Sequence, residues 1–390
     1  MEIKTSTRLD HFKTGIFAFL DEKRRAMEKD GKEVINFSIG TPDFTAPDEV
    51  VNALVKGASN PTTYGYTLTE IPELITALCD YYKRRFNTDI SPDEITSTNG
   101  SQEGIGHLAM ALCDKGDIAL LPNPGYPIFS AGAYLGGAEE YYYPVLEKNN
   151  YLPQLDEIPE DICKRAKYII VSYPSNPVCA IAPDAFYDEL ISWAKKHNII
   201  VVHDNAYSDI IYDGHVGGSF LSHEGAKDVG IEFFSLSKSF NLTGARVSFA
   251  IGNKDVVAAI KKLRSQYDFG IFRPIQEAAV KALSVDYTDF LYEQRLKYQE
   301  RRDALCDGLS SIGWLVPKGQ GTMFAWMPIP KKFKSSEEFC FELLEKTGVL
   351  CTPGSAFGSL GEGYVRFALT KTIDETKKAI KKIDESGILK

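Results

Sequence analysis

Lys238 has the surroundings that an amine needs to react with a carbonyl compound. It lies in the run Ser235-Leu-Ser-Lys-Ser, which directly follows the apolar segment 229–234, and it precedes Arg246 by eight positions. Desolvation and a nearby cation both disfavour the charged form of a lysine, so its neutral amine can attack an aldehyde. Ser235 and Arg246 could hold a phosphate beside it. The run therefore points to pyridoxal phosphate held as a Schiff base, with an ordinary turn and a solvated lysine as the alternative.

Asp204 is a second candidate, because it directly follows the most apolar segment, 199–203. A carboxylate there is costly to bury unless it is paired. Paired with a pyridine nitrogen, it would keep that nitrogen protonated and make the ring an electron sink. Tyr207 could bind the phenolic oxygen of the same ring. The alternative for Asp204 is the N-cap of a helix.

Three further segments suit a planar, phosphorylated ligand. The turn 98–106, Thr-Asn-Gly-Ser-Gln-Glu-Gly-Ile-Gly, puts Ser101 and Gln102 at a helix start, where backbone amides form an anion site. The loop Pro-Asn-Pro-Gly-Tyr-Pro fixes Tyr126 for stacking on a ring, and Asn176, before a proline, offers an amide donor. Taken alone, each segment would be interpreted as an ordinary turn or loop. All these segments occur in one sequence, with Asn176, Asp204, Lys238 and Arg246 in that order. This joint occurrence favours a single site.

Apolar runs that predict buried strands come before most of these residues. They cover 117–122, 168–173, 199–203 and 247–251, and amphipathic stretches separate them, such as 185–196 with Phe186, Leu190, Ile191 and Ala194 on one face. Strands buried on both faces and separated by helices predict an α/β fold with a doubly wound, mostly parallel sheet. Ligands of such sheets bind at the carboxyl ends of the strands.

The pattern changes near residue 280. Long charged amphipathic helices are expected at 287–309, 335–347 and 374–386, with short strands at 323–327 and 364–368. This predicts a large ligand-binding domain, residues 46–280, and a smaller α+β domain formed by 1–45 and 281–390.

Composition narrows the class of protein. The 390 residues are 44% hydrophobic and 25% charged, with a net charge of −9, which argues against nucleic acid as a partner. Seven scattered cysteines without a CxxC pair indicate free thiols rather than disulfides or a metal site. No signal-peptide pattern opens the chain, and no apolar run reaches the ~18–20 residues of a membrane span. We expect a cytoplasmic protein without membrane or metal partners.

Over nearly its whole length the chain resembles the class I/II aminotransferases of the fold-type I pyridoxal-phosphate superfamily. The resemblance implies that Lys238 is the Schiff-base lysine and Asp204 the partner of the pyridinium nitrogen. It implies that Asn176 and Tyr207 contact the phenolic oxygen, that Tyr126 stacks on the ring, and that Ser101, Gln102, Ser235 and Arg246 surround the phosphate.

The same resemblance implies three contacts from other segments. Tyr66 resembles the tyrosine that the family lends across a homodimer to the neighbouring phosphate, with Tyr64 as a substitute because a glycine usual before Ile71-Pro72 is absent. Arg366, in Gly-Tyr-Val-Arg-Phe-Ala, resembles the arginine that binds the substrate α-carboxylate through two parallel hydrogen bonds. A solvated surface arginine is the alternative. Gly40 resembles the glycine whose backbone approaches that carboxylate.

The implied reaction is reversible transfer of an amino group between an amino acid and a 2-oxo acid, by a ping-pong mechanism with Lys238 as acid and base. The segments 124–127, 204–210 and 225–241 are most similar to LL-diaminopimelate aminotransferases and their relatives, which implies LL-diaminopimelate with 2-oxoglutarate. Two departures could reshape the pocket: Val178-Cys179 replaces a usual Thr-Gly, and Ala245 a usual Trp. Aspartate, alanine and aromatic substrates stay open, as does a carbon–sulfur β-lyase on the same fold.

Overall fold

A computed structural model describes residues 1, 3–12 and 16–390, in two compact units. The first unit comprises Thr41–Gln299 with Gln320–Thr322, and the second comprises Met1–Gly40, Glu300–Gly319 and Met323–Lys390. The predicted large domain, 46–280, falls within the first unit. Residues 281–299, assigned from the sequence to the small domain, also belong to the first unit, where Gln294 bonds to the backbone of Lys238.

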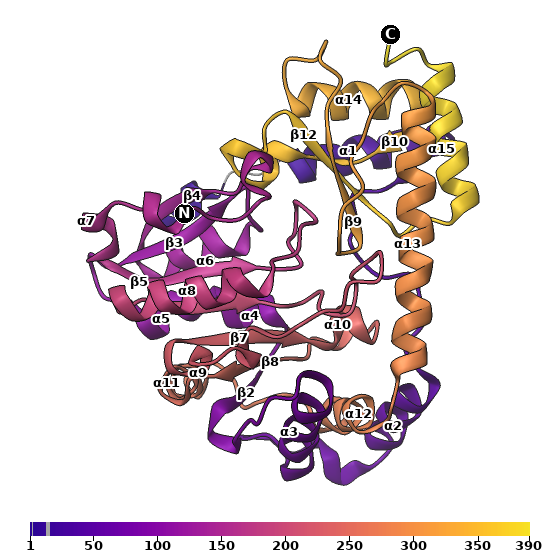
Figure 1. The fold of residues 1–390 in the computed structure, drawn as a ribbon. Helices are drawn as coiled ribbons and strands as arrows, with labels where there is room; N and C mark the ends of the chain where they lie inside the picture. Colours follow the sequence, from indigo (N-terminus) through magenta and orange to yellow (C-terminus); the bar gives the residue numbers. More distant parts are fainter. Residues whose placement is uncertain (2, 13–15) are drawn as a thin grey trace. The chain divides into compact units, whose positions relative to one another are not determined.

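A seven-stranded sheet forms the centre of the first unit, in the order β2-β8-β7-β6-β5-β3-β4 (Figure 1). Its strands are β2 (Ile95–Thr98), β3 (Ile118–Asn123), β4 (Glu139–Pro144), β5 (Ala166–Ser172), β6 (Ile200–Asp204), β7 (Gly230–Ser235) and β8 (Ser248–Gly252). Neighbouring strands from β7 to β4 are parallel, whereas β8 is antiparallel to both β7 and β2. The sheet is therefore mostly parallel, as predicted.

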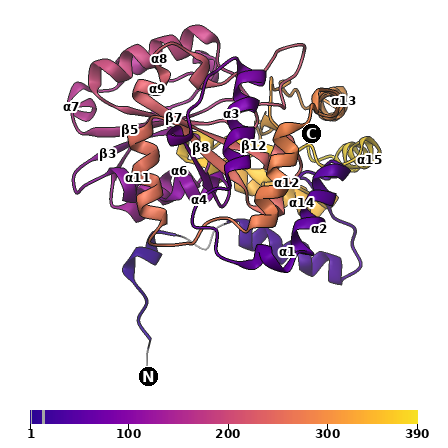
Figure 2. The same ribbon diagram turned by 90° about the horizontal axis from the view of Figure 1, so that it is seen from below.

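Helices cover both faces of this sheet. The helices of the first unit are α2 (Asp48–Ala58), α3 (Pro72–Phe86), α4 (Ser101–Gly106), α5 (Leu108–Leu112), α6 (Ile128–Gly136), α7 (Glu160–Cys163), α8 (Asp184–His197), α9 (Ala226–Val229), α10 (Leu236–Ser239), α11 (Lys254–Arg264) and α12 (Arg273–Ser284). The helix α13 (Thr288–Ser311) begins in the first unit, and its residues from Glu300 onward belong to the second. Figure 2 shows α8 and α9 on one side of the strands and α4 and α6 on the other. Two layers of helices around a buried sheet are what near-continuous apolar strands require.

The core explains why the sequence predicted these elements well. Side chains of β3, β5, β6 and β7 pack with α4, α5, α6 and α11 in one buried cluster that includes Leu121, Ile170, Val202 and Phe233. The predicted apolar face of α8 is buried, since Phe186, Leu190, Ile191 and Ala194 all lie inside. Burial of one face stabilises an amphipathic helix against a sheet.

The second unit contains a small antiparallel sheet in the order β11-β12-β9, formed by β11 (Thr352–Pro353), β12 (Tyr364–Ala368) and β9 (Phe324–Pro328). A short parallel pair joins β1 (Ile35–Asn36) to β10 (Val349–Leu350). The helices α1 (Ile16–Lys29), α14 (Ser336–Thr347) and α15 (Ile373–Glu385) belong to this unit. The side chains of Thr372 and Glu375 cap the start of α15 reciprocally, which is why it begins there.

No helix in the described part of the chain is long and apolar enough to cross a membrane.

Candidate active site

The predicted site residues of the first unit gather at one edge of the large sheet. Asn176, Asp204 and Lys238 follow or end the parallel strands β5, β6 and β7, whose carboxyl ends share that edge. Ser101 follows β2, and Arg246 precedes the reversed strand β8, so both come to the same edge. Residues that are 145 positions apart in the sequence are thus brought to one place by the strand order.

Asp204 is the last residue of β6, and no helix follows it, since 205–209 form a turn region. The N-cap alternative is therefore wrong for this residue. The side chain is buried, and burial raises the pKa of its carboxyl to about 6, against the opposing effects of the His203 charge and a hydrogen bond from the Ala206 amide. Its Oδ1 is buried with no hydrogen-bond partner among the residues that the structure describes. A buried acceptor of this kind suits a cationic N–H donor.

Ser101 and Arg246 form a second group of donors. The Ser101 hydroxyl is buried, and the described residues offer it no partner. The Arg246 guanidinium lies against the backbone of Gly100, where a Cβ would come within 2.0 Å of Nη2. Gly100 also has φ of 85°, so only glycine fits here. A hydroxyl and a guanidinium held together in this way can bind an anion from two sides.

Other predicted cofactor contacts are positioned by local hydrogen bonds. The Tyr126 hydroxyl donates to Oε1 of Gln102 at 3.2 Å, which joins the loop after β3 to α4. Ser235 caps α10, accepting from the Ser237 amide at 3.2 Å. Tyr207 is buried in the turn after β6, with 7% of its surface exposed.

Lys238 lies in the short helix α10, whose backbone is held from α13. Nε2 of Gln294 donates to the carbonyl oxygens of Lys238 at 3.0 Å and Ser239 at 3.3 Å. Oε1 of Gln294 accepts from Asn241 Nδ2 at 2.6 Å. The Ser239 hydroxyl donates to Asp209 at 2.6 Å. This role of Gln294 was not predicted, because nothing near it in the sequence points to a residue 56 positions away.

The segment after β5 has a cysteine at a position whose backbone conformation favours glycine. Asn176, Val178 and Cys179 are all buried, and Cys179 has φ of 61°. Its carbonyl accepts from the amides of Gln320 at 2.8 Å and Gly321 at 3.1 Å. These bonds hold the Asn176 loop although the backbone conformation at Cys179 would suit glycine better.

Arg366 and Gly40 lie together in the second unit. Arg366 is only 6% exposed, so the alternative of a solvated surface arginine is wrong. Its guanidinium carbon is 4.0 Å from the ring centre of Phe324 and 4.6 Å from that of Phe357, and Nη2 is 3.4 Å from the Ser38 carbonyl. A Cβ on Gly40 would come within 2.5 Å of the Phe324 ring. Phe324 thus contacts both residues that were predicted to bind a carboxylate.

Tyr64 and Tyr66 differ in their hydrogen bonds and in their exposure. The Tyr64 hydroxyl donates to the Ala58 carbonyl at 2.7 Å, within its own chain. Tyr66 is 82% exposed, and its ring lies 4.7 Å from that of Phe269. The Tyr66 hydroxyl makes no hydrogen bond with any residue that the structure describes, which leaves it available to a ligand or another subunit.

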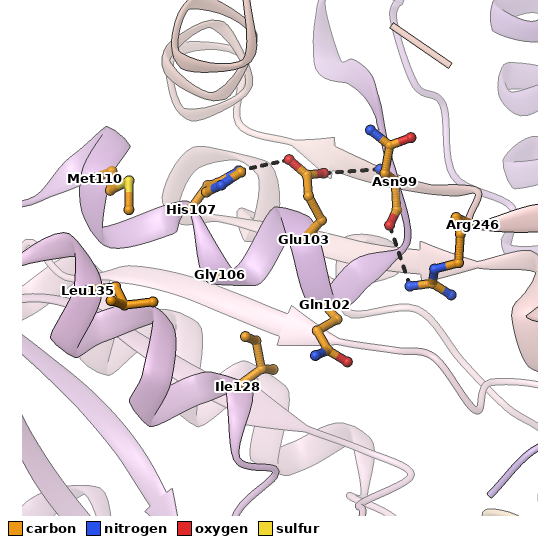
Figure 3. A pocket seen from close by; sticks show the side chains of 9 residues that line it. All are labelled: Asn99, Gln102, Glu103, Gly106, His107, Met110, Ile128, Leu135 and Arg246. Atoms are coloured by element: carbon orange, nitrogen blue, oxygen red, sulfur yellow. Dashed lines mark hydrogen bonds and ion pairs between the residues drawn. The ribbon is translucent and has the colours of Figure 1, made fainter. Parts of the chain in front are cut away.

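A cavity of about 600 Å³ opens beside the donors Gln102 and Arg246 (Figure 3). Oε1 of Glu103 lies 2.7 Å from Nδ1 of His107, and Oε2 accepts from the Asn99 amide at 3.0 Å. Apolar side chains complete the wall, contributed by Met110, Ile128 and Leu135. The cavity thus combines polar groups near the anion-binding donors with an apolar side.

Comparisons with known proteins agree with this architecture. The family described as "Aminotransferase class I and II" matches residues 32–383. An LL-diaminopimelate aminotransferase of Halothermothrix orenii is 41% identical over 388 residues and covers 99% of each chain. One from Aquifex aeolicus is 39% identical over 380 residues, covering 97% of this chain and 98% of its own.

Solved structures give the same result. The apo-BacF structure from Bacillus subtilis superimposes with a TM-score of 0.95 at 35% identity, covering 99% of this chain and 98% of its own. A probable N-succinyldiaminopimelate aminotransferase of Thermus thermophilus has a TM-score of 0.89 at 32% identity, covering 95% and 100%. The chain belongs to the class I and II aminotransferase family, whose members depend on pyridoxal phosphate. It is an enzyme that transfers an amino group between amino acids and 2-oxo acids.

Proposed function

We propose that this aminotransferase binds pyridoxal phosphate at the carboxyl edge of its large sheet and uses Lys238 as the reacting amine. The observation that carries the proposal is the buried Oδ1 of Asp204, which has no partner among the described residues and lies at the same sheet edge as Lys238. A protonated pyridine nitrogen is a donor that fits it. The Ser101 hydroxyl, also buried and without a described partner, fits a phosphate oxygen.

When bound, pyridoxal phosphate supplies an aldehyde that bonds to amines and a ring that takes up the electrons of the substrate α-carbon. Within this chain, Asp204 would hold the pyridine nitrogen, while Asn176 and Tyr207 would bind the phenolic oxygen. Tyr126 would lie on the ring, and the phosphate would be held by Ser101, Gln102, Ser235 and Arg246. Lys238 would move the proton between the α-carbon and the cofactor as general base and acid.

Arg366 would bind the α-carboxylate that every amino-acid substrate carries. Its guanidinium is fixed between the rings of Phe324 and Phe357, which limits the side-chain freedom that binding would otherwise remove. The backbone of Gly40 would approach the same carboxylate. The close contact between Gly40 and Phe324 supports this role, because it leaves no room for a side chain at position 40.

For the substrate we propose LL-diaminopimelate as amino donor and 2-oxoglutarate as acceptor. Support comes from the curated relatives named LL-diaminopimelate aminotransferase, which match nearly the whole chain at 37–41% identity. Val178 and Cys179 are buried in the segment that carries Asn176. Compared with a Thr-Gly pair, Val178 lacks a hydroxyl and Cys179 adds a side chain, and both changes bear on which substrate side chain is accepted.

We also propose a homodimer in which Tyr66 reaches the phosphate of the partner subunit. Exposed apolar side chains of the first unit support it, namely Tyr64, Tyr66, Leu68, Tyr267, Phe269 and Phe272. Soluble monomers rarely expose so many large side chains of this kind together, and aromatic residues are enriched at interfaces. A two-fold axis would give each subunit one such contribution.

The test combines cofactor binding with a donor panel. Purified chain incubated with pyridoxal phosphate should give the visible absorption band of the lysine-bound cofactor, and Lys238→Ala should lack it. Initial rates are then measured for LL-diaminopimelate, aspartate, alanine and phenylalanine with 2-oxoglutarate and with pyruvate. LL-diaminopimelate with 2-oxoglutarate should be fastest. Pyruvate and ammonia released without any oxo-acid acceptor would instead indicate a β-lyase.

A further inference from the structure

A second carboxylate is buried one strand away from Asp204. The β6–β7 register places Glu232 opposite His203, the residue directly before Asp204. The side chains of His203 and Glu232 are 1% and 0% exposed, and Nδ1 of His203 lies 2.9 Å from Oε2 of Glu232. Because side chains alternate along a strand, this pair lies on the sheet face opposite the Asp204 carboxylate.

Both oxygens of the buried Glu232 carboxylate accept hydrogen bonds. Its Oε1 accepts the hydroxyls of Tyr82 and Ser219, each at 2.9 Å, and its Oε2 accepts the Phe220 amide at 2.9 Å in addition to His203. Three donors thus surround the two oxygens, and Nδ1 of His203 is a fourth when it carries a proton. A set of four donors is what an ionised carboxylate accepts.

The other ring nitrogen of His203 has two polar neighbours. Its Nε2 lies 3.1 Å from the carbonyl oxygen of Tyr173 and 3.3 Å from the hydroxyl of Tyr187. The Tyr173 carbonyl can only accept, so the shorter contact is a hydrogen bond when Nε2 carries a proton, and a protonated Nδ1 donates to the Glu232 carboxylate in the same way. A proton on both nitrogens would make His203 an imidazolium paired with Glu232.

The geometry points to a role for this pair. We propose that His203, held as an imidazolium by Glu232, is a positioning residue that keeps Asp204 ionised for the cofactor's pyridine nitrogen. Burial favours a protonated Asp204, and a fixed positive charge on the neighbouring residue acts against it. The titratable groups around His203 are Glu232 on β7, Tyr187 on α8 and, through the carboxylate, Tyr82 on α3. The catalytic meaning of the inference rests on the proposed cofactor site, but the charge relationship concerns this chain alone.

The first test needs no change in the pair. His11, His107, His197, His215 and His223 are the other five of the chain's six histidines. Replacing these five with glutamine in the full-length chain leaves His203 as the sole imidazole signal in nitrogen-15 NMR, recorded at pH 7.5 with and without added pyridoxal phosphate. We expect both ring nitrogens to show protonated chemical shifts. A neutral ring, with one unprotonated nitrogen, would overturn the proposal.

The second test measures Asp204 itself, by infrared titration of the full-length chain without added cofactor, using Asp204→Asn to isolate its carboxyl signal. His203→Gln should make Asp204 at least ~10-fold weaker as an acid. Tyr82→Phe is the matched control, since it removes one hydrogen bond to Glu232 but neither charge, and should change the acidity less than about twofold. Unchanged acidity in a folded His203→Gln chain contradicts the proposal. If His203→Gln does not fold, the nitrogen-15 result decides.

A shift in Asp204 acidity in a chain that fails to bind pyridoxal phosphate would refute the proposed function and leave this inference standing.

Discussion

The side-chain amide of Gln294 fixes the backbone of Lys238, with Nε2 3.0 Å from the lysine carbonyl oxygen. Gln294 is buried on α13, and Asn241 orients its amide by donating to Oε1. Lys238 occurs in a helix of only four residues, which has few backbone hydrogen bonds of its own. The position of the reacting amine therefore depends on a residue from a distant helix.

Gln294→Leu should lower kcat about tenfold while the protein stays folded, because the carbonyls of Lys238 and Ser239 lose their common donor. The loss of unfolding free energy should be about 1–3 kcal/mol, the cost of leaving buried carbonyls unpaired. Gln299→Leu on the same helix is the control, since Gln299 accepts from the Asp213 amide at 3.0 Å and bonds to neither Lys238 nor Ser239. Equal kcat in the two variants would show that Gln294 has no special role.

Asp204 gives a prediction for the pH dependence of stability. Its pKa is raised from 3.8 to about 6 by burial, so the folded chain holds the proton more tightly than the unfolded chain. The resulting stability is fully present below pH 4 and is lost as the pH rises through about 6. A difference of about two pH units corresponds to about 3 kcal/mol.

Asp204→Asn does not titrate, so without cofactor it should gain about 3 kcal/mol relative to the unaltered chain between pH 4 and pH 7. Urea unfolding at several pH values measures this difference. With pyridoxal phosphate present the same variant should bind the cofactor more weakly and lose activity by about 100-fold or more. A difference in stability that does not vary with pH would refute the assigned burial of this carboxylate.

Arg366→Lys should raise KM for every amino donor about tenfold or more. The α-carboxylate is common to all of them, and a lysine cannot form the two parallel hydrogen bonds of a guanidinium. Steady-state kinetics with each donor that the unaltered enzyme accepts measures the effect. An increase for one donor alone would mean that Arg366 binds a substrate side chain.

Tyr66 leads to a complementation experiment. Tyr66→Phe subunits should bind the phosphate more weakly, and Lys238→Ala subunits should lack the reacting amine. In a mixed dimer the Tyr66→Phe subunit would keep Lys238 and receive Tyr66 from its partner, so activity should exceed that of either parent. Mixing Asp204→Ala with Lys238→Ala is the control, because both residues serve the same subunit's site and no intact site can form. Recovery in neither mixture, or a fully active monomer by light scattering, would exclude the crossing tyrosine.

The residues at the strand ends could be predicted from the sequence, because apolar runs identify buried strands and parallel strands share a carboxyl edge. Asp204 and Lys238 were found in this way. The supporting contacts were not, since the bond from Gln294 to Lys238 joins residues 56 positions apart. Local sequence carries no trace of such a contact.

The pairing of His203 with Glu232 was not predicted, although both residues stand out in the sequence. Glu232 interrupts the apolar run Gly-Ile-Glu-Phe-Phe, and His203 ends the run Ile-Ile-Val-Val-His. A charged or titratable residue inside a buried strand requires a partner. Pairing these two across adjacent strands would have predicted the ion pair, but the register of β6 and β7 is a property of the folded sheet.

The most direct test of the central claim locates the amine that bonds to the cofactor. The enzyme is loaded with pyridoxal phosphate, reduced with borohydride to fix the cofactor covalently, digested and analysed by mass spectrometry. We predict the added mass on Lys238 and its absence from Lys238→Ala. Stoichiometric labelling of any other lysine, with Lys238 unmodified, would show that Lys238 is not the reacting amine.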